Sequence, residues 1–173
     1  MAAITEAEFT EIYRTHYPDV LRFVRRRAHP LNVDDIVGET FLAAWRRRGD
    51  LPSNPRPWLF GTARNAMLNS ARGSNRQTAL AVRIGQADES SGLLGMRGLE
   101  QRIDVIAAWR TLSAADQEAL ALHVWEDLSA KDAAATLGCS RAAYAMRLTR
   151  AKRALAAELT VPVTGPISLV TTS

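Results

Sequence analysis

The sequence predicts an all-α protein made of two small helical domains that are joined by a flexible linker. Apolar residues recur at helical spacing along much of the 173-residue chain, and no segment shows the strict two-residue alternation of a half-buried strand. Five of the ten glycines fall between Gly73 and Gly98, in a stretch also rich in Ser, Gln and Asn, as is typical of linkers. The predicted boundaries are 1–72 for the first domain, 73–105 for the linker, 106–159 for the second domain and 160–173 for a C-terminal tail.

The net charge of +4 is the difference between 22 basic and 18 acidic residues, and it is unevenly distributed. The first domain has eleven arginines against eight acids, the linker is neutral, and the second domain has seven basic residues against six acids. The single Cys139 excludes an intrachain disulfide and a cysteine-based zinc site. The acidic start is unlike a secretion signal, and no apolar run approaches the roughly 18 residues of a membrane helix. We therefore expect a cytoplasmic protein without membrane insertion.

Helix start signals define the first half of the first domain. Thr5 followed by Glu8 forms a capping-box pattern. Asn32 is expected to cap the next helix, in which apolar or small residues recur at helical spacing from Val33 to Trp45. The opposite side of this helix is polar, with Leu42 among charged residues. An exposed leucine is ordinary on a protein surface, but it can also be the centre of a protein-docking face.

The second half of the first domain begins with a loop, Gly49–Pro57, in which three prolines in six residues exclude a helix. A further helix is expected from about Trp58 to Arg72. Its Arg and Asn residues, beside the stiff loop and exposed aromatics, could grip a single nucleic-acid strand by charge and stacking. Tryptophans such as Trp45 and Trp58 are more often core residues than platforms for base stacking. In the linker, a short helix is possible near Leu80–Ile84.

The second domain carries the clearest physical pattern. Ser113-x-x-Asp116 and Ser129-x-x-Asp132 resemble capping boxes at the starts of two helices. The second of these helices is short and rich in alanine, and Gly138 and a longer basic helix follow it. This order is typical of a helix-turn-helix, in which glycine adopts the turn conformation and Cys139 would pack as a small buried residue.

The longer basic helix, from about Arg141 to Leu159, is expected to bury one face and expose the other. At about 100° per residue, Tyr144, Leu148, Ala151 and Leu155 share the face predicted to be core. From Arg141 to Arg153 the helix has five basic residues and no acid, and Ser140 can cap it. In a helix-turn-helix this pattern favours contact with the major groove of DNA, with arginine contacts to phosphate the most general kind.

Two motif sets in this order resemble a known family. The first is Asp34-Asp35-Ile-Val-Gly-Glu39-Thr-Phe, followed by Pro57-Trp58-Leu-Phe-Gly-Thr-Ala-Arg64-Asn65, and the second is the helix-turn-helix. Together they resemble the extracytoplasmic-function (group 4) sigma factors of bacterial RNA polymerase. The resemblance covers about residues 5–72 as region 2 and 106–159 as region 4. Ala145 departs from the family pattern, which usually has Lys or Arg at this groove-facing position.

The resemblance implies an alternative sigma factor, not an enzyme, that recognises −35 and −10 promoter elements and helps to open DNA without a cofactor or metal. The implied partners are core RNA polymerase, through its β′ clamp helices and β flap, promoter DNA and an anti-sigma factor. For polymerase binding it implies Asp34, Asp35, Glu39, Leu42 and Arg46. For the −10 element it implies Asn54, Arg56, Trp58, Arg64, Asn65 and Arg72. For the −35 element it implies Ser140, Arg141, Ala145, Arg147, Arg150 and Arg153.

Three alternative interpretations remain open from the residues. A phosphorylation-controlled regulator could share the helix-turn-helix, but its receiver would need alternating strands and helices, a pattern absent from residues 1–72. An enzyme could use the acids at 34, 35 and 39 as a metal or acid–base cluster, although the three histidines show no ligand spacing. A protein-interaction module could use the same helices without promoting transcription.

Overall fold

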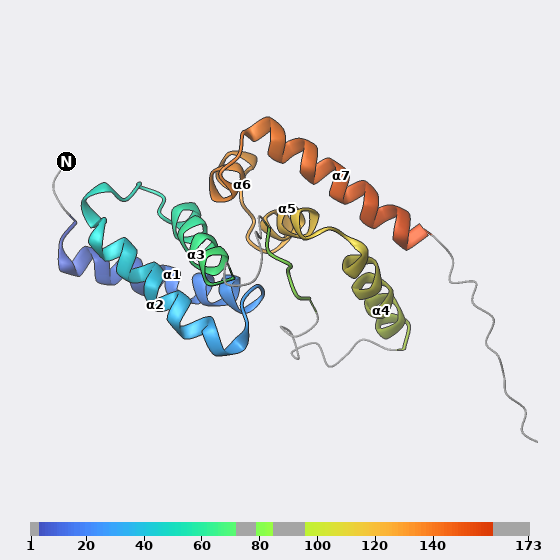
Figure 1. Ribbon diagram of the computed structural model, residues 1–173, viewed down its shortest axis with the longest axis horizontal. Coiled ribbons are helices and arrows are strands. Elements are labelled where there is room, and N and C mark those ends of the chain that lie inside the picture. Colours follow the sequence, from blue (N-terminus) through green and yellow to red (C-terminus); the bar gives the residue numbers. More distant parts are fainter. Residues whose placement is uncertain (1–3, 72–78, 85–95, 161–173) are drawn as a thin grey trace, which may run out of the picture.

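The computed structural model describes residues 4–71, 79–84 and 96–160. In this part of the chain there are helices and no strand, in the order α1 (Glu6–Arg25), η1 (Pro30–Asn32), α2 (Val33–Arg46), η2 (Arg48–Asp50), α3 (Arg56–Ala71), α4 (Met96–Thr111), α5 (Ala114–Val124), α6 (Ala130–Leu137) and α7 (Arg141–Thr160). Figure 1 shows α1 to α3 as one group and α4 to α7 as another, with α6 beside α3. None of the described helices is long and apolar enough to cross a membrane. The prediction of an all-α fold with two helical units is confirmed.

The first unit, α1 to α3, is built around the apolar faces that the sequence predicts. Phe23 of α1 and Phe60 of α3 stack with ring centroids 4.5 Å apart, and both side chains are almost completely buried. Thr5 begins α1 with the predicted capping box, because the Thr5 hydroxyl oxygen accepts from the Glu8 amide and the Glu8 carboxylate accepts from the Thr5 amide. Pro18 lies inside α1 without ending it.

Two helix starts in the first unit differ from the prediction. Asn32 makes no side-chain cap to α2; instead Nδ1 of His29 accepts from the Leu31 amide at 3.3 Å and begins the preceding 3₁₀ turn. Helix α3 begins at Arg56, inside the segment predicted to be loop. Proline is tolerated in a first helical turn, where its missing amide would have no partner in the helix, and Pro57 occupies this place.

The second unit, α4 to α7, contains the predicted helix-turn-helix as α6 and α7. Gly138 between them has φ +66°, the left-handed conformation that glycine adopts at little cost. Tyr144 of α7 is 1% exposed, and its hydroxyl donates to the Ala119 carbonyl of α5 at 3.2 Å. Cys139 is half-buried, less than the full burial that the turn position suggested. The predicted buried face of α7 is therefore confirmed: Tyr144 and Ala151 are buried, and Leu148 and Leu155 are half-buried against the core.

Residues 79–84 of the linker form no helix, so the short helix predicted there is wrong. Their backbone is bonded to the second unit rather than to itself. The Val82 amide donates to Oε1 of Gln117 at 2.9 Å, and Nε1 of Trp109 donates to the Val82 carbonyl at 2.7 Å. These two bonds satisfy the groups that a helix would otherwise use, and the Val82 side chain is buried in the core of the second unit.

The same linker segment also contacts the first unit. The Arg83 amide donates to the Arg26 carbonyl at 2.8 Å, and the Arg83 guanidinium donates to the Ala28 carbonyl. Helix α4 then begins at Met96, inside the range 73–105 predicted to be linker. Consecutive linker residues are thus attached to opposite units, which is a bridge rather than a loose tether.

The two units pack directly against each other through α3 and α6. A Cβ placed on Gly61 would lie 3.6 Å from the Thr136 carbonyl, so the two helix backbones approach closely. The Thr136 hydroxyl donates to the Pro57 carbonyl at 3.2 Å. One cluster of buried residues includes Leu59 from the first unit and Ala133 from the second. The chain therefore has a closed arrangement, in which the face of α3 is partly covered by the second unit.

Candidate nucleic-acid interface

Helix α7 lies along the outer edge of the second unit (Figure 1), and several of its basic side chains are exposed. Its first turn is capped by Ser140, whose Oγ accepts from the Ala143 amide at 3.1 Å. The structure brings all the predicted −35 residues together on this helix. Five of them are exposed, and one, Arg147, is half-buried; the exposed ones are Ser140, Arg141, Ala145, Arg150 and Arg153.

Arg150 is held in place by Asp116 of α5. Its Nη2 and Nε donate to Oδ1 of Asp116 at 2.7 and 3.1 Å, and the Ser113 hydroxyl donates to the other carboxylate oxygen at 2.8 Å. Burial favours a raised pKa for Asp116, but the hydrogen bonds from Arg150 and Ser113 outweigh it and lower the pKa below its usual value. The Arg150 side chain remains 64% exposed, so the pair orients the guanidinium without removing it from solvent.

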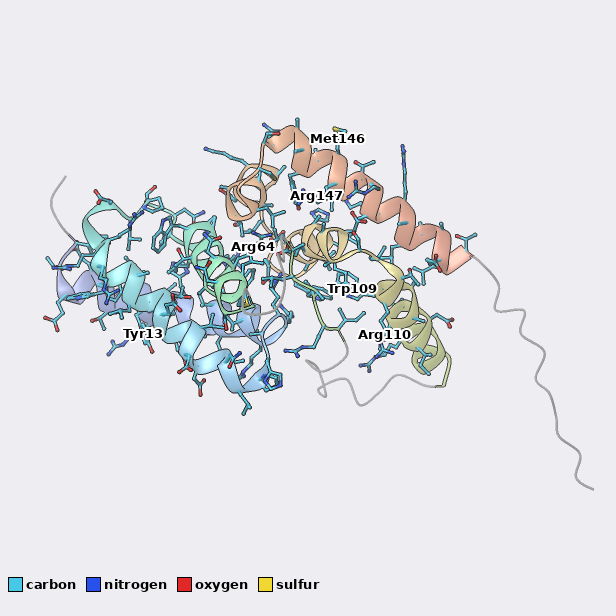
Figure 2. All side chains as sticks on the ribbon, viewed as in Figure 1. Tyr13, Arg64, Trp109, Arg110, Met146 and Arg147 are labelled. Carbon is cyan, nitrogen blue, oxygen red and sulfur yellow. The ribbon has the colours of Figure 1, made fainter. Side chains whose placement is uncertain are left out.

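A shallow groove lies on the exposed side of α7. Two arginines, Arg150 and Arg153, line it together with Ala145, Met146, Thr149 and Ala154. Met146 is 74% exposed and points away from the rest of the molecule (Figure 2). Small apolar side chains can contact thymine methyl groups, whereas arginines can reach phosphates, so the surface offers more charge than base-specific hydrogen bonding.

The outward side of α2 holds a second set of predicted residues. Asp34, Asp35, Glu39 and Arg46 are exposed, and Leu42 among them is 48% exposed. The structure therefore brings together the five residues predicted to bind polymerase, as an apolar side chain surrounded by charges. Within residues 4–71, 79–84 and 96–160, no three His, Cys, Asp or Glu side chains gather in a way that could hold a metal ion.

Four of the residues predicted for the −10 element line one cleft. Asn54, Trp58, Arg64 and Asn65 border this cleft of about 550 Å³, which lies between the loop before α3 and helix α6. The opposite wall of this cleft includes Lys131 and Asp132 of the second unit. Trp58 is half-buried, whereas Asn54 and Asn65 are exposed.

Two of the predicted −10 arginines, Arg56 and Arg64, are bound to other groups of the protein in this arrangement. Arg64 is 8% exposed, and its Nε and Nη2 donate to the two carboxylate oxygens of Glu118 at 2.8 and 2.9 Å. Figure 2 shows Arg64 where α3 faces the second unit. Arg56 donates through Nε to Asp19 at 2.8 Å and through Nη1 to the Glu126 carbonyl at 2.6 Å. Arg72 lies outside the described residues.

The sequence analysis missed the residues that hold these arginines. Glu118 and Glu126 of the second unit are 1% and 3% exposed. Glu126 also accepts from Nη1 of Arg27 at 3.1 Å, and Arg27 lies over the Phe23 ring at 3.7 Å. Burial lowers the pKa of Arg27, and the Glu126 carboxylate opposes this shift. One feature of the sequence does indicate that Glu118 is buried. It directly precedes four apolar residues, 119–122, whereas a helix face in contact with solvent has no such run.

Family models match both units. The model for sigma-70 region 2 matches residues 12–77, and the model for sigma-70 region 4 matches residues 102–155. The first match begins inside α1 and includes α2 and α3, and the second includes the helix-turn-helix of α6 and α7.

Individual proteins are similar over most of the chain. RNA polymerase sigma factor NccH of Alcaligenes xylosoxydans xylosoxydans is 33% identical over 74% of this chain and 73% of its own. ECF RNA polymerase sigma factor SigC of Mycobacterium tuberculosis is 31% identical over 81% of this chain and 77% of its own. Among solved structures, the sigma factor RpoE in complex with the anti-sigma factor NepR from Bartonella quintana matches with TM-score 0.66 and 25% identity, covering 89% of this chain and 98% of that one.

Proposed function

The chain belongs to the ECF RNA polymerase sigma factors, and we propose that it is a group 4 member that directs bacterial core RNA polymerase to promoters with −35 and −10 elements. It acts as an alternative sigma factor: it binds the polymerase, contacts both elements and helps to open the DNA between them. Contacts to the polymerase and capture of the melted strand would offset the few kcal/mol that each unstacked step costs. No covalent chemistry is ascribed to the chain itself.

The observation that carries this proposal is the combination of a region 2 unit and a region 4 helix-turn-helix in one chain, in that order. A helix-turn-helix alone would support many kinds of DNA-binding protein. A receiver domain in the first unit would require strands, whereas residues 4–71 form helices and 3₁₀ turns and contain no strand. The combination of region 2 and region 4 is more specific than a helix-turn-helix alone, so the proposed function rests on the combination.

Run-off transcription tests the proposal. The purified chain is mixed with bacterial core polymerase and fragments of genomic DNA, and products are compared with those of core polymerase alone. Defined products that depend on the chain are expected, and their start sites identify the promoter. Products no different from those of core polymerase alone would contradict the sigma-factor function.

We assign polymerase binding to the charged face of α2, with Leu42 at its centre. Asp34, Asp35, Glu39 and Arg46 would form the polar rim of a contact with the β′ clamp helices, and region 4 would contact the β flap. An apolar centre with a charged rim is the usual anatomy of a protein–protein interface. Exposure of all five side chains supports this assignment.

Leu42→Arg is expected to weaken binding to core polymerase at least about tenfold, since a central apolar contact is replaced by a charge. The fold should be retained, because Leu42 is 48% exposed. Competition for core polymerase against a labelled sigma factor measures the affinity. Leu31→Arg is the matched control, because Leu31 is 84% exposed but lies in η1, outside this face. Wild-type affinity of the Leu42 variant would mean that this leucine is an ordinary surface residue.

We assign the promoter contacts to two surfaces. Asn54, Trp58 and Asn65, with Arg56, Arg64 and Arg72, would hold the −10 strand, the loop before α3 capturing a flipped base. The exposed side of α7 would lie at the −35 element, with Arg141, Arg147, Arg150 and Arg153 on phosphates and bases. The groove with Ala145 at one end favours apolar contact and DNA shape over a dense set of base hydrogen bonds.

Replacing both Arg150 and Arg153 with alanine is expected to weaken −35 DNA binding and to flatten its salt dependence. Each lost phosphate contact should reduce the slope of log K against log salt by about one. A binding titration at several salt concentrations measures the slope. Arg110→Ala on α4 is the control, since Arg110 is also exposed but lies outside the α7 face. An unchanged slope in the double variant would refute the assignment.

We further propose control by an anti-sigma factor and a cytoplasmic location, where polymerase and promoter DNA reside. The similar structures support this part of the proposal. The matched RpoE structure contains the anti-sigma factor NepR, and a second match, CnrH, was solved with the cytosolic domain of CnrY at TM-score 0.61 and 25% identity. Co-purification of the chain with a product of its own operon would identify the partner.

A further inference from the structure

Asp116, in the first turn of α5, is a buried acid whose two carboxylate oxygens have different partners. Oδ2 accepts from the Ser113 hydroxyl at 2.8 Å, and the Asp116 amide donates to Oγ of Ser113 at 3.2 Å. Oδ1 accepts from Nη2 and Nε of Arg150 at 2.7 and 3.1 Å. The carboxylate is therefore fixed by the start of its own helix, and it fixes an arginine of α7.

This pair uses only one edge of the Arg150 guanidinium. The group is planar and carries N–H donors on all three nitrogens, and the edge facing Asp116 is that of Nε and Nη2. The next edge, formed by Nη1 and the second hydrogen of Nη2, presents two parallel donors that do not point at Asp116. Because the Arg150 side chain is 64% exposed, this edge is available to a ligand.

Arg150 lies on the part of α7 that the proposed function places at the −35 element. It lines the shallow groove together with Ala145, the position that faces the DNA groove in the sigma-factor pattern. In the major groove, guanine alone offers two acceptors on one base edge, N7 and O6. Adenine pairs its N7 acceptor with a donor amino group, so two parallel donors match guanine best.

Fixed orientation distinguishes Arg150 from other exposed arginines of α7. Within the part of the chain that the structure describes, no carboxylate forms an ion pair with Arg141 or Arg153. Contact with a phosphate needs only charge within reach, whereas a base edge must be met at the correct angle. A side chain that is held in advance also loses less conformational freedom when it binds.

We propose that Asp116 is a positioning residue for promoter recognition: it holds Arg150 so that the outer edge of the guanidinium reads one guanine of the −35 element. The inference rests on the proposed function, and in particular on the place of α7 at this element. Asp116 itself stays off the DNA, since its oxygens are turned to Ser113 and Arg150. The unpaired arginines of α7 would then supply charge, while Arg150 supplies the choice of base.

The test measures discrimination between bases rather than affinity alone. Holoenzyme is assembled from core polymerase and each full-chain variant, and it is titrated with a labelled duplex that carries the promoter mapped by run-off transcription. Each −35 position is then changed singly. Arg150→Ala is expected to lose about tenfold discrimination at one G·C pair. Asp116→Ala should lose most of the same discrimination at the same pair, with changes below about twofold at the others.

Two further measurements separate positioning from a merely structural role. Adding Asp116→Ala to Arg150→Ala should cause no further loss at that pair, because both act through one contact. Replacing the guanine with 7-deazaguanine removes one of its two acceptors. This change should weaken binding of the wild type and leave binding of Asp116→Ala nearly unaltered, whereas equal weakening of both would overturn the inference.

Asp132→Ala is the matched control. Asp132 has the same place in α6 as Asp116 in α5, since it accepts from the Ser129 hydroxyl at 2.7 Å and its amide donates to Oγ of Ser129 at 3.1 Å. It is exposed, and among the described residues no arginine forms an ion pair with it. The control removes the same charge and the same capping acid, so its base discrimination should equal that of wild type. A loss like that of Asp116→Ala would overturn the inference.

The remaining outcomes distinguish this inference from the proposed function. Wild-type discrimination in Asp116→Ala, or no base-specific loss in Arg150→Ala, overturns the positioning role while the sigma-factor function stands. A wild-type chain that gives no promoter-dependent product with core polymerase refutes the sigma-factor function itself. Circular dichroism checks the fold of each variant. If Asp116→Ala does not fold, Asp116→Asn, which keeps the shape but not the charge, is tested with the same expected direction.

Discussion

Replacing Phe60 with alanine is expected to lower the free energy of unfolding by about 3–5 kcal/mol, as is usual for a buried phenylalanine. The Phe60 side chain is 0% exposed and stacks on Phe23 at 4.5 Å. Its removal would leave a cavity in a buried cluster that includes residues of both units. Urea unfolding followed by circular dichroism measures the loss.

Phe9→Ala is the control for this substitution. Phe9 is half-buried and meets Trp45 edge-on at 5.0 Å at the far end of α1, so it should cost clearly less. A cost for Phe60→Ala no larger than that of Phe9→Ala would contradict the packing described for α1 and α3. Because the cluster around Phe60 includes residues of α6, the substitution should also weaken the contact between the units.

Local features of the fold were predictable because they depend on residues close in sequence. The buried face of α7 follows from the 3.6-residue period, and Tyr144 and Ala151 are buried as expected. The caps at Ser113 and Ser129 accept from amides three residues ahead, at 3.2 and 3.1 Å. A capping residue in the sequence does not always form a cap. Asn32 makes no side-chain cap to α2, and His29 caps the preceding 3₁₀ turn instead.

Features that depend on residues far apart could not be predicted in the same way. Arg64 is 54 positions from Glu118, and Arg27 is 99 positions from Glu126. No periodicity within either helix indicates such a pairing, so the sequence suggested only a contact with −10 DNA for Arg64. The linker shows the same limit: residues 79–84 are fixed by bonds to Gln117 and Trp109, while their composition indicates a loose chain.

The attachment of the linker makes Trp109 the second position with a large expected effect. Trp109→Ala should lower the free energy of unfolding by about 3–5 kcal/mol. The indole is 5% exposed, meets Trp125 edge-on at 5.1 Å, and anchors the core of the second unit. Chemical denaturation followed by far-ultraviolet circular dichroism measures the loss, because tryptophan fluorescence itself changes in the variant.

Trp109→Phe separates packing from the linker bond. Phenylalanine retains most of the apolar contact but leaves the Val82 carbonyl without its donor, a loss of about 1–3 kcal/mol.

The effect of Trp109→Phe should be local: hydrogen exchange at the Val82 amide should speed up, while amides in the middle of α5 stay protected. Faster exchange throughout α5 would mean that the indole supports the whole second unit and has no particular role at the linker. The local result would instead show that one hydrogen bond attaches the linker to region 4, beside the bond from Arg83 to region 2.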